Sequence, residues 1–340
     1  MTASHLKIAV VGATGAVGEA LLAILEERDF PVAELVPLAS ERSAGEVLRF
    51  RGRPATVREL SSYDFAGVDI AFFSAGGAIS AGHAPRAAAA GAVVIDNTSQ
   101  FRRDPDVPLV VSEVNPEALA RRPRGIVANP NCSTMQMLVA LAPLHRAVGI
   151  ERIEVASYQS VSGAGRRAME ELGKQTARML NFQDAAPALF PVQIAFNVIP
   201  QIDSFQDNGF TREEMKMVWE THRILDDDTI QVNPTCVRVP VFYGHALACH
   251  VRLRGAMTAA AARALLAAAP GVELVDQPEP GGYPTPVSHA AGTDPVYVGR
   301  IRQDLFCERS LNFWIVADNI RKGAALNAVQ LAELLVKDFS

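Results

Sequence analysis

Short apolar runs alternate with amphipathic or polar stretches in the first part of the chain. Residues 6–13 (LKIAVVGA) form a continuous β-rich run, and residues 19–30 (EALLAILEERDF) follow with apolar positions at helical spacing. Later apolar runs are separated by stretches such as AISAGHAPRAAAAG; they read VDIAFFSA, AVVIDNTS and GIVANPN. This alternation predicts βαβ units, a parallel sheet and therefore an α/β fold.

Length and composition limit the possible classes of protein. A chain of 340 residues exceeds the roughly 250–300 residues at which single cores stop growing, so we expect two domains. Charged residues make up 20% with a formal net charge of -5, and no basic face indicates a nucleic-acid partner. Arg, His or Pro interrupts every apolar run before about 18 residues, and the N-terminus shows no cleavable signal pattern. We therefore expect no membrane partner and a cytoplasmic location.

A glycine-rich turn, GATGAVG at residues 12–18, follows the first predicted strand and opens the first predicted helix. Such glycines let the backbone turn tightly and approach a pyrophosphate, which then lies at the helix N-terminus. A plain tight turn is the alternative, but the strand–turn–helix setting favours dinucleotide binding. The predicted cofactor contacts in this turn are Gly12, Thr14, Gly15, Ala16 and Val17.

The residues after the second predicted strand bear on which dinucleotide is bound. NAD sites usually offer Asp or Glu there to the ribose hydroxyls. Here Arg42 and Ser43 can hold a 2′-phosphate, with Ser40 as a further cofactor contact. Glu41 could serve a 2′-hydroxyl instead, so the pattern favours NADP while leaving NAD open.

Cys132 lies in NPNCS, between a predicted strand and the run CSTMQMLVALAPLHRAV, which has helical spacing. The N-terminus of a helix lowers the pKa of a thiol and favours the nucleophilic thiolate. The alternative is a small buried apolar side chain. At the carboxyl edge of a dinucleotide-binding sheet a nucleophile is favoured, and a thiolate beside a nicotinamide indicates hydride exchange with a thioester or thiohemiacetal.

The chain has four cysteines without a C-x-x-C pair, so we expect reduced thiols. His245, Cys249 and His250 could be read as a metal cluster, but their strand-like run would point neighbours to opposite faces. No metal is expected.

Further motifs carry a resemblance that extends from residue 8 to residue 335. They are GATGAVG, SERSAG, SAGG, VIDNTSQFRRDPDVPLVVSEVNP, ANPNCST, SVSGAG, TREEMK, CVRVPVFYGH, VGRIRQD and VADNIRKGAALNAVQLAE. In this order they resemble the successive blocks of the aspartate-semialdehyde dehydrogenases.

The resemblance implies a Rossmann-type NADP-binding domain of residues 1–129 and 319–340, and an α+β catalytic and dimerisation domain of residues 130–318. The C-terminal helix would return to the first domain. The implied reaction is the NADPH-dependent reductive dephosphorylation of L-aspartyl-4-phosphate to L-aspartate 4-semialdehyde, in the biosynthesis of lysine, threonine, methionine and isoleucine. A homodimer or a dimer of dimers is expected.

The resemblance also assigns roles to residues. Cys132 would be the nucleophile, Gln159 would orient the acyl intermediate and His245 would be the general acid/base, a role that suits a group titrating near neutral pH. Arg238 would pair with the substrate α-carboxylate. Arg102 and Lys216 would contact the phosphate, and Glu213 the substrate ammonium. Asn131 is a further implied substrate contact. Ser162, Gly163 and Asn319 would contact the nicotinamide half of the cofactor.

Some alternatives remain at this point. Glu213 and Lys216 could form an ordinary surface ion pair. The stretch 246–250, together with Gln100 and Ser112, departs from the family pattern and bears on subunit contacts and substrate fit. An N-acetylglutamyl-phosphate reductase is a rival enzyme, and a non-catalytic paralogue acting as a binding subunit is a rival class. Retention of the nucleophile and its predicted partners argues against the second.

Overall fold

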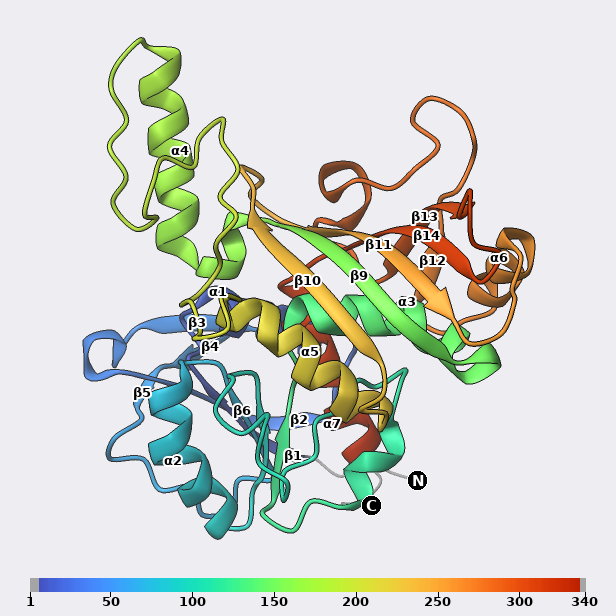
Figure 1. Cartoon of the computed structure of the whole chain (residues 1–340). Helices are drawn as coiled ribbons and strands as arrows, with labels where there is room; N and C mark the ends of the chain where they lie inside the picture. The colour runs from blue at the N-terminus through green and yellow to red at the C-terminus, as the bar shows by residue number, and fades with distance from the viewer. Residues whose placement is uncertain (1–5, 337–340) are drawn as a thin grey trace. The chain divides into compact units, whose positions relative to one another are not determined.

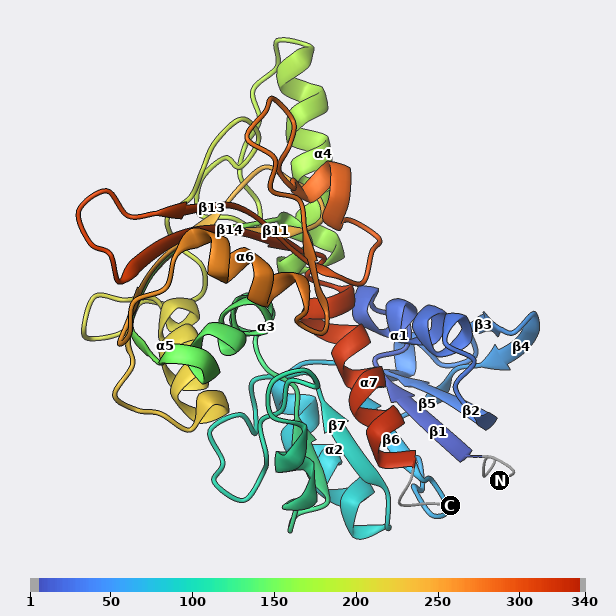
Figure 2. The same ribbon diagram turned by 90° about the vertical axis from the view of Figure 1, so that its right-hand side faces the viewer.

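The computed structural model describes residues 6–336, which group into two compact units (Figures 1 and 2). The first unit contains the described residues of Met1–Pro130 and Ala324–Ser340, and the second is Asn131–Gly323. Residues 1–5 and 337–340 of the predicted first domain lie outside the described residues. The sequence places the return to the first domain at residue 319, whereas residues 319–323 group with the second unit, because the Asn319 side chain bonds Ser160 and Ser162.

The first unit is built on a six-stranded sheet in which every paired strand is parallel. In spatial order its strands are β5 (Arg58–Glu59), β2 (Val32–Ala39), β1 (Leu6–Val11), β6 (Ile70–Phe73), β7 (Val93–Asp96) and β8 (Ile126–Ala128). The central strands are apolar on both faces, as expected where helices cover a parallel sheet. This confirms the predicted α/β fold.

Three helices accompany this sheet: α1 (Ala16–Glu27), α2 (Gly77–Ala89) and α7 (Leu326–Leu335). Leu21 and Leu25 of α1 share one buried cluster with Leu331 and Leu335 of α7, so the C-terminal helix packs in the first unit as predicted. Ser112, one of the residues that depart from the family pattern, lies against α7, since its hydroxyl is 3.0 Å from the Gln330 side chain. A separate hairpin consists of β3 (Val47–Phe50) and β4 (Arg53–Thr56).

The second unit contains a mixed sheet with helices on one face (Figure 1). In spatial order the strands are β10 (Gln231–Arg238), β9 (Ile150–Gln159), β11 (His245–Leu253), β14 (Ser310–Ala317), β13 (Val296–Gln303) and β12 (Val272–Leu274). The helices on this face are α3 (Cys132–Val148), α5 (Arg212–Leu225) and α6 (Ala259–Ala267). Helix α3 is buried almost all round, which explains its nearly continuous apolar sequence.

Helix α4 (Arg166–Leu180) projects from the second unit, and the chain then runs back along it (Figure 1). The buried Glu171 accepts hydrogen bonds from the amides of Ala188 and Leu189, and Gln175 accepts from those of Ile194 and Ala195. The segment that contains these four amides forms no strand. The Glu171 and Gln175 side chains therefore supply the hydrogen-bond acceptors that a neighbouring strand would otherwise provide. Within residues 6–336, none of the helices is both long and apolar enough to span a bilayer.

Candidate active site

The first unit has a cavity of about 590 Å³ at the carboxyl ends of its parallel strands. Gly12 follows β1 and Ser74 follows β6, where the chain switches from one side of β1 to the other. Open α/β sheets bind ligands at such a switch point. The predicted cofactor residues that line this cavity are Gly12, Thr14, Gly15, Ser40, Arg42 and Ser43. Ala16 and Val17 do not line it but form the first turn of α1.

The glycine turn is as tight as the sequence predicts. Gly12 has φ +86°, and a Cβ there would lie 2.9 Å from the Ser74 Oγ, while a Cβ on Gly18 would lie 2.2 Å from the Gly12 carbonyl oxygen. Gly15 caps α1 without any side-chain hydrogen bond, so the amides of the first turn are not capped by a side chain. The turn, the uncapped helix and the cavity fit a dinucleotide with its pyrophosphate at the helix N-terminus.

Glu59, Ser61 and His83 also line this cavity, and sequence reasoning missed them. Glu59 belongs to β5, a strand of only two residues that leaves no periodic signal. His83 and Ile79 are one turn apart on α2, a spacing that indicates a shared helix face but not what the face meets.

In the second unit, three strand ends bring predicted site residues together. Gln159 ends β9 and Arg238 ends β10, and the two are paired in parallel register. His245 begins the neighbouring antiparallel strand β11 and is paired with Ala317 at the end of β14, two residues before Asn319. The sheet register thus places four predicted residues at one end of the sheet, although they are far apart in the sequence.

Cys132 begins helix α3, as predicted. Asn131 is the N-cap residue, and its side-chain oxygen accepts from the amides of Ser133 and Thr134 at 3.0 and 3.2 Å. The backbone amide of Asn131 donates to the buried Glu220 carboxylate at 2.6 Å. These bonds fix the residue next to the thiol, and the N-terminal end of a helix stabilises a thiolate.

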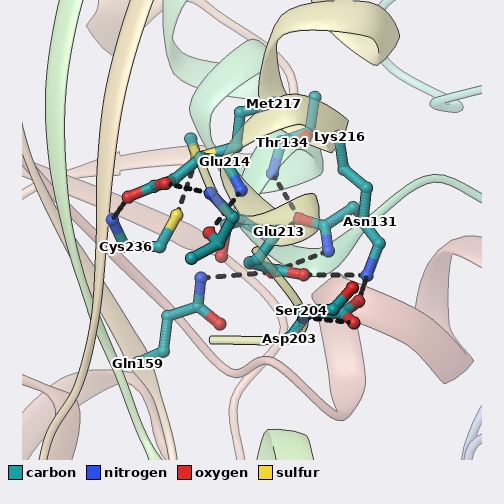
Figure 3. A network of polar contacts seen from close by, with 12 residues as sticks. Asn131, Thr134, Gln159, Asp203, Ser204, Glu213, Glu214, Lys216, Met217 and Cys236 are labelled. Atoms are coloured by element: carbon teal, nitrogen blue, oxygen red, sulfur yellow. Dashed lines mark hydrogen bonds and ion pairs between the residues drawn. The ribbon is translucent and has the colours of Figure 1, made fainter. Parts of the chain in front are cut away.

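Glu213 of α5 lies at the centre of a buried polar network (Figure 3). Its carboxylate accepts from the side-chain amides of Asn131 at 2.9 Å and Gln159 at 3.2 Å, and pairs with Lys216 at 3.0 Å. Burial raises the pKa of this carboxyl, but Lys216 and the two amide donors outweigh it and hold the pKa below its ordinary value. Glu213 and Lys216 do form the ion pair of the alternative, but the pair is largely buried and not at the surface, since Glu213 is 5% exposed.

The ammonium of Lys216 also contacts Asp203, which sequence reasoning missed. The Lys216 Nζ lies 2.9 Å from the Asp203 carboxylate (Figure 3). Burial lowers the pKa of Lys216, yet Glu213 and Asp203 outweigh this effect and raise the pKa above its ordinary value. Asp203 lies in a loop and its own φ is +69°. No periodic pattern or motif in the sequence could have identified it.

Arg238 and His245 lie side by side in front of Gly163. A Cβ on Gly163 would lie 3.0 Å from the Arg238 Nη1 and 3.2 Å from the His245 Nε2. The Arg238 Nη1 donates to the Ser160 carbonyl oxygen at 2.8 Å, and both side chains are buried. Glycine at position 163 therefore keeps open the space that a guanidinium and an imidazole share.

The predicted nicotinamide contacts of the second unit are bonded to one another. The Asn319 amide nitrogen donates to the Ser162 hydroxyl at 3.0 Å, and Ser162 belongs with Gly163 to the short 3₁₀ turn Val161–Ala164 after β9. Arg102 lies instead in the first unit, where its guanidinium donates to the carbonyl oxygens of Asn129 and Asn97.

Gln136 and Gly323 are two further residues that sequence reasoning missed. Gln136, one turn after Cys132, donates to the His245 carbonyl oxygen at 3.2 Å and so joins α3 to β11. A Cβ on Gly323 would lie 2.7 Å from the Cys132 Cβ, so only glycine permits this approach. The spacing of Gln136 from the nucleophile was the one available signal.

Two of the remaining cysteines, Cys236 and Cys249, are buried, whereas Cys132 and Cys307 are partly exposed. All four thiols are free. Burial raises the pKa of Cys236 and of Cys249, which makes both poor nucleophiles. His250 is paired with Asp304 at 2.9 Å, and within residues 6–336 no group of three or more His, Cys, Asp or Glu side chains is arranged to hold a metal.

Comparison with known proteins identifies the family. Residues 7–122 match the semialdehyde dehydrogenase NAD-binding domain, and residues 141–322 match the semialdehyde dehydrogenase dimerisation domain. An aspartate-semialdehyde dehydrogenase of Legionella pneumophila is 58% identical over 98% of this chain and 97% of its own length. The chain belongs to the aspartate-semialdehyde dehydrogenase family.

Other members of this family agree in sequence and in structure. Aspartate-semialdehyde dehydrogenase 2 of Vibrio cholerae is 58% identical over 98% of this chain and 99% of its own length. A crystal structure of aspartate semialdehyde dehydrogenase II complexed with ASA, from Vibrio cholerae, has a TM-score of 0.97 and covers 99% of this chain and 100% of its own. The chain is therefore an oxidoreductase of the aldehyde-dehydrogenating type with an NAD(P)-binding domain and a dimerisation domain.

Proposed function

We propose that the chain catalyses the NADPH-dependent reductive dephosphorylation of L-aspartyl-4-phosphate to L-aspartate 4-semialdehyde. The observation that carries this proposal is the position of Cys132 at the start of α3, in the same unit as the cluster of Gln159, Arg238 and His245 at one sheet end. The proposed setting is the biosynthesis of lysine, threonine, methionine and isoleucine in the cytoplasm.

In the first step, the Cys132 thiolate attacks the acyl carbon of the phosphorylated side chain. The C–O bond to phosphate breaks, phosphate leaves with the electron pair, and the substrate is held as a thioester. A bound reduced nicotinamide supplies hydride to this thioester. His245 acts on the carbonyl oxygen, and Gln159, which is held by Glu213, orients the acyl group.

The charged side chains suit the two ends of this substrate. The planar guanidinium of Arg238 offers a fork that matches the α-carboxylate. Glu213 faces the site as an ionised carboxylate and suits the substrate ammonium, with Asn131 as a neighbouring polar contact. Lys216 and Arg102 are the proposed phosphate contacts, because compact and planar cations both bind phosphate oxygens.

We infer that the cofactor is NADP. Arg42 and Ser43 follow β2 and line the cavity, where a 2′-phosphate can pair with a guanidinium and a hydroxyl. Thr14, Ala16 and Val17 belong to the glycine turn of residues 12–18, which would hold the pyrophosphate. The proposed nicotinamide contacts are Ser162, Gly163 and Asn319. The dimerisation domain supports a homodimer, and a dimer of dimers is the proposed alternative assembly.

The test is an assay of phosphate-dependent NADP reduction with aspartate semialdehyde, repeated with N-acetylglutamate semialdehyde. The proposal predicts a strong preference for aspartate semialdehyde and no turnover without phosphate. Preference for the acetylated substrate would instead favour an N-acetylglutamyl-phosphate reductase. Absence of turnover with both, in folded protein that binds NADP, would favour a non-catalytic binding subunit.

A further inference from the structure

Lys216 shares its ammonium between two carboxylates. Its Nζ lies 3.0 Å from the Glu213 carboxylate and 2.9 Å from that of Asp203 (Figure 3). An ammonium has three N–H donors, so these two contacts leave one donor for a further acceptor. Two carboxylates against one ammonium also leave an excess of negative charge around the cation.

The two carboxylates approach the ammonium from different environments. The side chain of Glu213 is 6% exposed, that of Lys216 is 16% exposed and that of Asp203 is 35% exposed. Glu213 lies one turn before Lys216 on α5 and therefore holds the ammonium from its buried side. A ligand that enters from solvent meets the ammonium on its more exposed side, which Asp203 occupies.

The loop that carries Asp203 holds this carboxylate against α5. One oxygen accepts from the Ser204 amide at 2.8 Å and the other contacts Lys216 (Figure 3). The Ser204 carbonyl oxygen in turn accepts from the Arg212 backbone nitrogen at 2.7 Å, which ties the loop to the start of the helix. The backbone of Asp203 is left-handed, a conformation that Asp and Asn adopt more readily than most residues.

Asp203 is ionised near neutral pH. Burial raises its pKa, but the hydrogen bond and charge of Lys216, the Ser204 amide and the Arg212 charge outweigh this effect and hold the pKa below its ordinary value. A phosphate group carries roughly one to two negative charges near neutral pH. A phosphate that reaches Lys216 therefore meets a second anion on the same ammonium, and the like charges repel each other.

We propose that Asp203 is a specificity-determining residue that competes with the phosphate group for Lys216. This inference rests on the proposed function, in which Lys216 contacts phosphate. Without phosphate, Asp203 occupies the exposed side of the ammonium. When a phosphate group binds, it takes the free donor and weakens or replaces the Asp203 contact. Asp203 thus lowers the affinity for phosphate and favours its departure after the thioester has formed.

Asp203→Asn tests this competition, because it removes the charge and keeps an oxygen that can accept from the Ser204 amide. Phosphate is varied in the assay with aspartate semialdehyde and NADP. We expect the KM for phosphate to fall about three- to tenfold, as for loss of a like charge a few ångströms from the ligand at a partly exposed site. The KM values for NADP and aspartate semialdehyde should change less than about twofold, because neither contact involves Lys216 in the proposed site.

The direction of the change separates competition from a structural role. If Asp203 only positioned Lys216, its loss would raise the KM for phosphate, so a raised or unchanged KM would overturn the proposal. Asp207→Asn removes one charge from an exposed position of the same loop and is the matched control. It should leave the KM for phosphate unchanged, and an equal fall in both variants would reduce the effect to net charge and refute a specific role for Asp203.

Asp203→Ser is a second variant without the charge, and its KM for phosphate should fall as in Asp203→Asn. It decides the question if the asparagine variant does not fold. In the reductive direction, inhibition by added phosphate should become stronger in both variants, because the product then leaves Lys216 less readily. A wild-type protein without phosphate-dependent turnover would refute the proposed function and this inference with it. An active wild type with an unchanged KM in both Asp203 variants would refute the role of Asp203 alone.

Discussion

The candidate sites of the two units are formed by different kinds of groups. The cavity of the first unit lies at a glycine turn, a helix start without a side-chain cap and the ends of parallel strands, and we call it the main-chain site because this backbone shapes it. The site of the second unit consists of buried charged side chains that satisfy one another, with Glu213 between Lys216 and two amides. A main-chain site tolerates substitution at its edges, whereas a buried side-chain network loses several contacts with each change.

The largest expected effect is that of Cys132→Ala, which removes the nucleophile. Turnover should fall by roughly 10⁴-fold or more, because the covalent intermediate cannot form. NADP titration should be nearly unchanged, because Cys132 is not among the proposed cofactor contacts. Cys307→Ser, in the hairpin between β13 and β14, is the matched control and should stay active. Substantial activity in Cys132→Ala would show that Cys132 is not the nucleophile and that the chemistry takes place elsewhere.

Glu213→Gln tests the buried network directly. Removing one partner of a buried pair typically costs about 3–5 kcal/mol, and we expect about 2–3 kcal/mol here because Lys216 keeps Asp203. The pKa of Glu213 is lowered by folding, so its contribution is present above the unfolded pKa and is lost as pH falls through the folded pKa. Urea unfolding should therefore show a gap between wild type and variant that is full at pH 7 and narrows in acid.

The control for that measurement is Glu170→Gln, which breaks an exposed pair with Lys174 on α4. Its cost should be below about 0.5 kcal/mol. Equal destabilisation by both substitutions would mean that burial does not strengthen the Glu213 contacts.

Arg238→Lys tests the geometry of the side-chain site at constant charge. A lysine ammonium cannot reproduce the planar fork, and loss of a charged hydrogen bond costs about 1.5–3 kcal/mol. The kcat/KM for aspartate semialdehyde should fall at least about tenfold, while the cofactor remains bound. Iodoacetamide labelling of Cys132, carried out in a Cys307→Ser background, checks the fold. A wild-type kcat/KM would show that the α-carboxylate is anchored elsewhere.

The smallest expected effect is that of Arg42→Ala at the rim of the main-chain site. Arg42 is exposed, so its pairing with a 2′-phosphate is screened by water, and we expect the KM for NADP to rise about tenfold or less. The KM for NAD should change little. Glu41→Gln is the companion variant, and a larger effect on NAD than on NADP would indicate that Glu41 serves the ribose hydroxyl. Equal effects of Arg42→Ala on both cofactors would exclude phosphate recognition.

The same contrast explains which features could be predicted from the sequence. The parallel sheet, the glycine turn and the start of the helix at Cys132 were predictable because each depends on residues within one local stretch. Asp203, Gln136 and Glu220 were not, because each acts on a residue in another segment of the chain. Family resemblance named the principal side chains of the second site, but it did not indicate what holds them.

The sequence by itself determined the alternation of strands and helices, the tight turn at Gly12 and the family of the chain, since apolar spacing and glycine positions act over a few residues. Only the tertiary structure decided that Glu213 is buried and ionised and that the His245 ring faces the Ser160 amide. Desolvation and hydrogen-bond direction depend on atoms that strand register brings together across the sheet, and no local pattern of residues specifies them.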